Sequence, residues 1–221
     1  LLFAPPDKVA WRLALSASVL AAAGALQLLA GPHPRLLFAY RFTPIVSLAL
    51  VMDAMGLLFA LIASCLWVFT VIYSHGYMAH EERLRSYLAF LILSLGITNG
   101  IALAGNLVTL FFFYEALTLV TFPLVIHRHT PEAMRAGIVY LAYNLAGATL
   151  VLLAIATLAG HVHKVDFIYG GIIPPGLFTR VQLVRLVILF VAGFGVKAAV
   201  IPLHHWLPRA MVAPTPVSAL L

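Results

Sequence analysis

Two ionisable residues lie in stretches of the sequence that are otherwise apolar. Glu115 falls inside NLVTLFFFYEALTLVTFPLVIH, and Lys197 falls inside RLVILFVAGFGVKAAVIPLHHWLP. An ionised side chain at the centre of a bilayer costs at least about 2.5–3.5 kcal/mol, so such residues are rare and mark ion pathways and proton relays. A buried lysine can hold a transferable proton, as a carboxylate can. The two residues are therefore candidates for proton transfer.

Each of these residues also has a structural interpretation. A protonated Glu115 can hydrogen-bond to a neighbouring helix and hold the two helices together. Lys197 can extend its charged end to the membrane surface while its stem stays in the apolar layer. An intramembrane carboxylate is by default a functional-site hypothesis, so the sequence favours function for Glu115. It leaves both interpretations of Lys197 open.

Three residues that follow Lys197 extend the candidate site. Pro202 cannot donate the backbone hydrogen bond of a continuing helix, which predicts a helix break just after Lys197. Broken helices at membrane depth are tolerated where they line a cavity. His204 and His205 follow the break and can pass protons between Lys197 and water, because imidazole titrates near neutral pH. A loop histidine by itself is more often simply solvated.

The composition identifies the surroundings of these residues. Hydrophobic residues make up 63% of the chain and charged residues 9%, with a mean hydropathy of +1.07, whereas roughly a quarter of the residues in a soluble domain are charged. The apolar segments reach the length of about 20 residues that a membrane span needs, and they lack the alternation of barrel strands. The sequence predicts an all-α, polytopic transmembrane helix bundle that contains a broken helix.

The expected organisation is a single transmembrane domain over residues 1–221, with the start of a further span. Its six spans cover residues 9–30, 45–73, 86–104, 107–126, 134–160 and 181–201. LLFAPP resembles the tail of an earlier helix and APTPVSALL the beginning of a later one, so we expect a piece of a longer subunit. Lysine and arginine are slightly more frequent in the loops on the side of residues 74–85 and 127–133, which predicts that this side is cytoplasmic.

Other classes of protein fit the sequence poorly. The formal charge of +6 is scattered through short loops, which argues against nucleic acid as a partner. The one cysteine, Cys65, excludes an internal disulfide and a cysteine-based metal site. Most of the nine histidines lie in loops, whereas haem in membrane bundles is held from facing helices. No phosphate-binding glycine loop appears, so we expect no metal and no cofactor.

Two smaller features concern packing. Gly96 and Gly100 lie four residues apart in GITNG, a spacing that allows close approach of another helix. Asp53 lies near the start of the second expected span, where a carboxylate can interact with the positive end of the helix dipole. Both features predict structural roles.

Two longer segments carry a resemblance to a known family. NLVTLFFFYEALTL and GFGVKAAVIPLHHWLPRAMVAPTPVSALL resemble the proton-translocating antiporter-like subunits that are shared by respiratory complex I, Mrp-type cation/proton antiporters and membrane-bound hydrogenases. The resemblance covers the chain from MDAMGLLFALIASCLWVFTVIYSHGYM onward. KAAVIPLHHWLP and APTPVSALL most resemble the subunit-D type of Mrp antiporters and related hydrogenase-associated subunits.

The resemblance implies a role for each candidate residue. Glu115 matches the carboxylate of the family's fifth helix, and Lys197 matches the lysine of the broken seventh helix that pairs with it. His204 matches the histidine of the HxWLP element, and His205 occupies its variable position. The implied fold is part of an antiporter-like fold with two inverted repeats. The second repeat is absent from this sequence, so a half-channel is expected and not a full path.

The function implied is proton or cation/proton translocation within a larger complex, by an Mrp-type antiporter first of all. The alternative is a proton-pumping subunit of a redox-driven enzyme of the NADH:quinone oxidoreductase or hydrogenase type, and the sequence does not decide whether the complex is an enzyme. A structural or coupling membrane subunit without its own ion path is an alternative of another class. The expected partners are other membrane subunits, the lipid bilayer, protons and sodium or potassium, in a bacterial or archaeal inner membrane.

Overall fold

The computed structural model describes residues 7–32, 34–43, 46–78, 81, 83–162 and 164–220. These residues are mostly helical, which confirms the predicted fold class. In chain order the elements are α1 (Asp7–Leu29), β1 (Arg35–Arg41), β2 (Ser47–Met52), α2 (Ala54–Tyr77), α3 (Leu84–Ala102), α4 (Leu107–Val125), α5 (Pro131–Ala159), α6 (Arg180–Lys197), α7 (Trp206–Ala210) and α8 (Thr215–Ser218).

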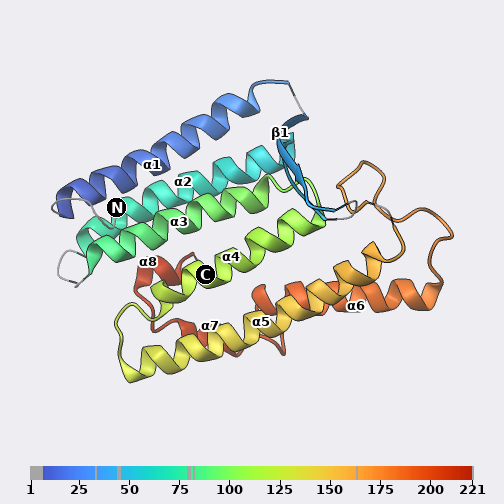
Figure 1. Ribbon diagram of the computed structural model, residues 1–221. Coiled ribbons are helices and arrows are strands. Elements are labelled where there is room, and N and C mark those ends of the chain that lie inside the picture. Colours follow the sequence, from blue (N-terminus) through green and yellow to red (C-terminus); the bar gives the residue numbers. More distant parts are fainter. Residues whose placement is uncertain are drawn as a thin grey trace.

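The long helices lie side by side, and successive helices run in opposite directions (Figure 1). Helices consecutive in the chain pack against each other from α1 to α6, and α1 also contacts α3. The strands lie at one end of the bundle, whereas α7 and α8 lie toward the other (Figure 1). Five helices, α1 to α5, are long and apolar enough to cross a membrane. Helix α6 is not among these five, and it carries three charged residues, Arg180, Arg185 and Lys197.

Side-chain caps define where the helices begin. The Asp53 carboxylate accepts a hydrogen bond from the Gly56 amide at 2.5 Å, which confirms its structural role at the start of α2. Asn106 caps α4 by accepting from the Thr109 amide at 2.8 Å. Such caps satisfy amides that have no partner within the helix. The Asn106 cap fixes the first turn of α4, the helix that carries Glu115.

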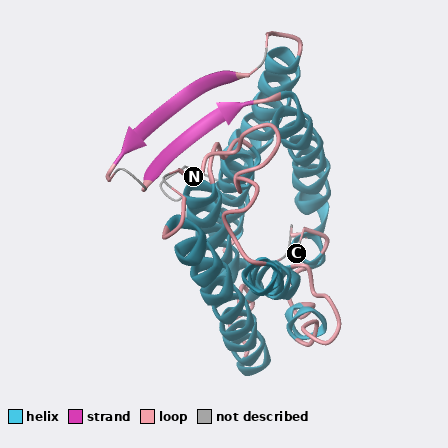
Figure 2. Ribbon diagram, turned by 90° about the vertical axis from the view of Figure 1, so that its right-hand side faces the viewer, coloured by secondary structure: helices cyan, strands magenta, loops and turns pink. Residues whose placement is uncertain are grey.

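The expected span over residues 45–73 is wrong at its beginning. Ser47–Met52 forms β2, which pairs antiparallel with β1 (Figure 2), and α2 begins only at Ala54. The second edge of β2 is also paired, because the Val51 amide donates to the Leu103 carbonyl at 2.8 Å and the Gly105 amide donates to the Ala49 carbonyl at 2.8 Å. A short apolar run suits a buried strand as well as a helix. The contacts with the turn between α3 and α4 favour the strand.

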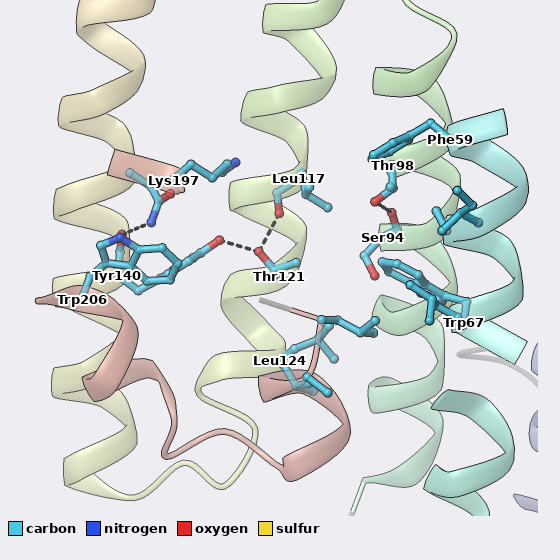
Figure 3. A pocket seen from close by; sticks show the side chains of 17 residues that line it. Phe59, Trp67, Ser94, Thr98, Leu117, Thr121, Leu124, Tyr140, Lys197 and Trp206 are labelled. Atoms are coloured by element: carbon cyan, nitrogen blue, oxygen red, sulfur yellow. Dashed lines mark hydrogen bonds between the residues drawn. The ribbon is translucent and has the colours of Figure 1, made fainter. Parts of the chain in front are cut away.

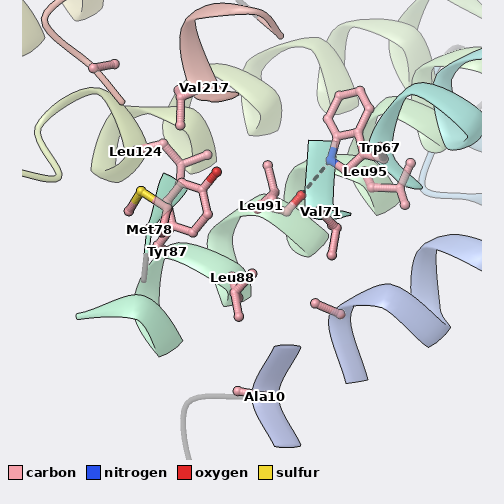
Figure 4. Close-up of a cluster of buried hydrophobic side chains, with 12 residues drawn as sticks. Ala10, Trp67, Val71, Met78, Tyr87, Leu88, Leu91, Leu95, Leu124 and Val217 are labelled. Carbon is pink, nitrogen blue, oxygen red and sulfur yellow. Dashed lines mark hydrogen bonds between the residues drawn. The ribbon is translucent and has the colours of Figure 1, made fainter. Parts of the chain in front are cut away.

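A buried apolar cluster joins α1, α2, α3 and the end of α4 (Figure 4). Within it, the Trp67 indole donates to the Leu91 carbonyl at 2.8 Å. The Tyr87 hydroxyl, which is fully buried, lies 2.8 Å from the Ser74 hydroxyl. These bonds satisfy the polar ends of large side chains inside the apolar layer, where an unpaired polar group is costly. They hold α2 and α3 in fixed register.

Glycines bring neighbouring helices close together. A Cβ atom on Gly100 would lie 2.5 Å from the ring of Phe113, so this glycine admits α4, as its spacing predicted. Gly96 has no such neighbour within 4 Å. Helices α5 and α6 also approach each other closely, because a Cβ on Gly193 would lie 2.8 Å from the Gly147 carbonyl oxygen. Gly193 lies one turn before Lys197 and therefore sets the position of that lysine beside the bundle.

Replacing Gly193 with alanine is expected to destabilise the complex by about 1–3 kcal/mol, because the added methyl group overpacks the contact between α5 and α6. The measurement is the Tm of the purified complex in a thermal scan. Gly96→Ala is the matched control, since its methyl group would enter open space. Equal melting temperatures for the two variants would contradict the assigned role of Gly193.

Candidate functional site

Lys197 is the last residue of α6, and its ammonium group lies against the middle of α4. Its Nζ atom donates to the Tyr114 carbonyl oxygen at 2.8 Å and to the Thr118 hydroxyl at 2.7 Å. The same atom lies 4.0 Å from the centre of the Tyr114 ring, within the range of a cation–π interaction. The ammonium group is thus held among buried residues of α4 and does not extend to the end of the bundle.

Glu115 lies on α4 between the two residues that hold Lys197. Its Oε1 atom is buried and has no hydrogen-bond partner among the described residues. Of the described side chains, those of Glu115 and Lys197 form no ion pair within 4.0 Å of each other. The structure places the ammonium group against the turn of α4 that carries Glu115, and it leaves the Oε1 atom of Glu115 without a hydrogen-bond partner among the described residues.

The end of α6 is stabilised by contacts of its own. Ala199 adopts a left-handed conformation with φ of 51°, which turns the chain away from the helix axis. The Val200 amide donates to the Gly195 carbonyl at 2.9 Å. The indole of Trp206, the first residue of α7, donates to the Val196 carbonyl at 2.7 Å. Pro202 lies in the turn between α6 and α7, and these bonds satisfy carbonyl groups left over at a helix end.

The two histidines lie on the same turn, and neither is hydrogen-bonded to Lys197 in the described part of the chain. His204 is half-buried, and its Nδ1 atom has no hydrogen-bond partner among the described residues. His205 is exposed, and the centres of the two rings are 4.7 Å apart. A proton that passes between Lys197 and either imidazole therefore needs bridging water.

A cavity of about 300 Å³ opens beside Lys197 (Figure 3). One wall is apolar and comes largely from α2, with Phe59, Ile62 and Leu66. The opposite wall holds the polar residues Lys197, Thr121, Tyr140 and Asn144. Most of the lining is apolar, so water can bind only beside the polar groups of this wall, although the volume itself exceeds the roughly 30 Å³ of one water molecule.

The polar wall of this cavity contains both paired and free groups. The Thr121 hydroxyl lies 2.6 Å from the Tyr140 hydroxyl (Figure 3). The Asn144 side chain is 1% exposed, and its Oδ1 atom has no hydrogen-bond partner among the described residues. A buried free acceptor that borders a cavity is a site for water. The cavity can thus be hydrated next to the ammonium group.

Sequence reasoning missed most of the residues that surround Lys197. Thr118 had one usable signal, because it follows Glu115 by three residues and must share its helix face. Tyr114 contributes a backbone carbonyl and a ring face, which no motif marks. Tyr140 and Trp206 belong to other helices, so only the packing of α5, α6 and α7 brings them to the site.

Comparisons with known proteins identify the family of the chain. The transmembrane family model described as NADH:quinone oxidoreductase/Mrp antiporter matches residues 104–221. The A1 subunit of the Na(+)/H(+) antiporter of Staphylococcus aureus (strain JH9) is 32% identical over 179 residues, which cover 78% of this chain and 22% of that protein. Because this relative is named as an A1 and not a D subunit, the narrower resemblance to the subunit-D type stays a prediction.

Two solved structures share the fold. A chain of the membrane-bound sulfane sulfur reductase, an archaeal respiratory membrane complex, has a TM-score of 0.81 and 20% identity, covering 97% of this chain and 44% of the other. A chain of the Mrp complex from Dietzia sp. DQ12-45-1b has a TM-score of 0.80 and 22% identity, covering 96% of this chain and 26% of the other. The chain spans less than half the length of each of these three proteins.

The region matched by the family model contains Glu115, Lys197, Pro202 and both histidines of the turn. It also contains helices α4 to α8, which build the ammonium site and most of the cavity's polar wall. The match extends over more than half of the 221 residues. This multi-pass membrane protein therefore belongs to the NADH:quinone oxidoreductase/Mrp antiporter transmembrane family.

Proposed function

We propose that this chain is a proton-transfer module of a cation/proton antiporter-like subunit, in which Glu115 and Lys197 carry the proton. The observation that carries the proposal is the position of Lys197, where α6 ends against the middle of α4 and places an ammonium group near an unpartnered carboxylate. Both groups would be costly in the membrane without such neighbours. Their electrostatic interaction makes the charge of each depend on the charge of the other.

The geometry supports a stepwise transfer. Glu115 takes up a proton at its free carboxylate, and Lys197 gives up a proton through bridging water. The cavity beside Lys197 supplies room for that water. His204 and His205 relay protons between this region and bulk water, since imidazole changes charge near neutral pH. Pro202 maintains the break that lets α6 end at this depth.

We also propose that the chain works with other membrane subunits. The relatives with the same fold are chains of membrane complexes, one named Mrp and one named a respiratory sulfane sulfur reductase. The curated relative is named for Na(+)/H(+) antiport, which supports sodium as the exchanged ion ahead of redox-driven pumping.

Inside-out membrane vesicles that contain the complex test this function. After respiration has acidified the vesicles, added sodium or potassium is expected to release protons, which a pH-sensitive acridine dye reports. Vesicles from cells without this chain serve as the control and should show no release. Acidification that NADH or hydrogen drives in these vesicles, and that is lost in the control vesicles, would assign the chain to a redox-driven pump. Neither response in an assembled complex would favour a structural or coupling subunit.

A further inference from the structure

We infer that Tyr114 and Thr118 form a second docking position for the Lys197 ammonium group, and that Thr118 is a positioning residue for the proton transfer. This inference rests on the proposed function. In the docked position the lysine faces the cavity and is separated from Glu115. The alternative position is an ion pair with Glu115, away from the cavity.

The docking position satisfies the ammonium group without a negative charge. Two oxygen atoms, the Tyr114 carbonyl and the Thr118 hydroxyl, accept from Nζ at 2.8 and 2.7 Å. The ring of Tyr114 adds a cation–π contact at 4.0 Å. Thr118 is fully buried and Tyr114 is 6% exposed, so these acceptors are shielded from bulk solvent. Hydrogen bonds to a charged donor are strong in such surroundings.

Glu115 lies within reach of the same lysine. Residues three apart on a helix have Cβ atoms about 5–6 Å apart, so Glu115 and Thr118 share a face of α4. The lysine stem is long and flexible, which allows its end to move between them. The Oε1 atom of Glu115 is buried without a partner among the described residues, so an acceptor is already present at the second position.

The two positions differ in their access to the cavity. Lys197, in its docked position, lines the cavity, whereas Glu115 is not one of the described residues that do. A lysine paired only with a buried carboxylate would be held there by their strong attraction in a medium of low dielectric. The neutral position on Tyr114 and Thr118 competes with that attraction. It therefore allows the ammonium group to return to the cavity, where water can take its proton.

Transport by reconstituted complexes that carry Thr118→Val or Thr118→Ser tests the inference. Valine keeps the shape of the side chain but removes the hydroxyl, and we expect the transport rate to fall about tenfold or more. Serine keeps the hydroxyl and should preserve transport. Thr98→Val is the matched control, since Thr98 lines the same cavity and does not contact Lys197. If Thr118→Val does not assemble, Thr118→Ala removes the same hydroxyl without the branched volume.

A structure of the Thr118→Val complex supplies the second measurement. Loss of the docking position should place Nζ of Lys197 within ion-pair distance of Glu115. Full transport by this variant would overturn the inference, provided that Glu115→Gln abolishes transport in the same preparation. Equal slowing by Thr118→Ser or by Thr98→Val would also overturn it, because a general packing defect would then explain the loss. Full transport by Glu115→Gln would instead overturn the proposed function itself.

Discussion

Complexes that carry Glu115→Gln are expected to assemble normally and to lose proton translocation by at least about 100-fold, the lower range for removal of a proton-transfer group. Glutamine has nearly the same shape as glutamate but cannot take up a proton. The Oε1 atom that it replaces has no hydrogen-bond partner among the described residues, so no native bond to it is lost. The measurement is dye-reported proton movement in proteoliposomes, alongside the yield of intact complex.

The matched control for this variant is Glu132→Gln. Glu132 lies exposed in the first turn of α5, where a negative charge interacts favourably with the helix end. We expect this control to transport normally. Normal pumping by a well-assembled Glu115→Gln complex would remove Glu115 from the proton path. Failure of that variant to assemble would favour the interpretation of Glu115 as a hydrogen bond between helices.

Replacing Lys197 with alanine is also expected to abolish transport, by a factor of at least about 100. The change removes the ammonium group and empties its position on Tyr114 and Thr118. The Thr118 hydroxyl can then donate fully to the Tyr114 carbonyl, which it already approaches at 3.4 Å. We therefore expect the complex to remain intact, as judged by gel filtration.

Two further substitutions sharpen this result. Lys197→Arg keeps a positive charge that cannot be released as a proton, so it should also be inactive if the lysine carries the proton. Lys164→Ala removes an exposed lysine in the loop between α5 and α6 and should leave transport unchanged. Full activity of Lys197→Arg would reduce the role of Lys197 to that of a fixed charge. Full activity of Lys197→Ala would exclude both roles.

The sequence predicted the helical fold class and drew attention to the two ionisable residues. Both inferences rest on the free-energy cost of placing unpaired backbone groups or charges in a membrane. A chain with 9% charged residues must satisfy its backbone within helices, and a charge in such a helix stands out. Strand β2 was not predicted, because its sequence SLALVM has no feature that separates a strand from the start of a helix. Only its pairing with β1 and with the turn between α3 and α4 decides between them.

The partners of Lys197 escaped prediction for a different reason. The ammonium group binds a backbone carbonyl and a ring face of Tyr114, and neither depends on a recognisable spacing of residue types. Glu115 was expected to be its direct partner, yet the nearest acceptors belong to the residues on either side of it in α4. Which acceptors the ammonium group reaches depends on the depth at which α6 ends, and close packing at Gly193 contributes to that depth.

The indole bond between Trp206 and the Val196 carbonyl connects two helices mechanically. Trp206 is also packed against the ring of Tyr140 on α5, with ring centres 5.4 Å apart. The first residue of α7 is therefore fastened to the peptide group next to Lys197, so a displacement of α7 shifts the anchor of the lysine side chain. A force applied to this short helix would therefore move Lys197 through the backbone, without any change in the charges around the lysine.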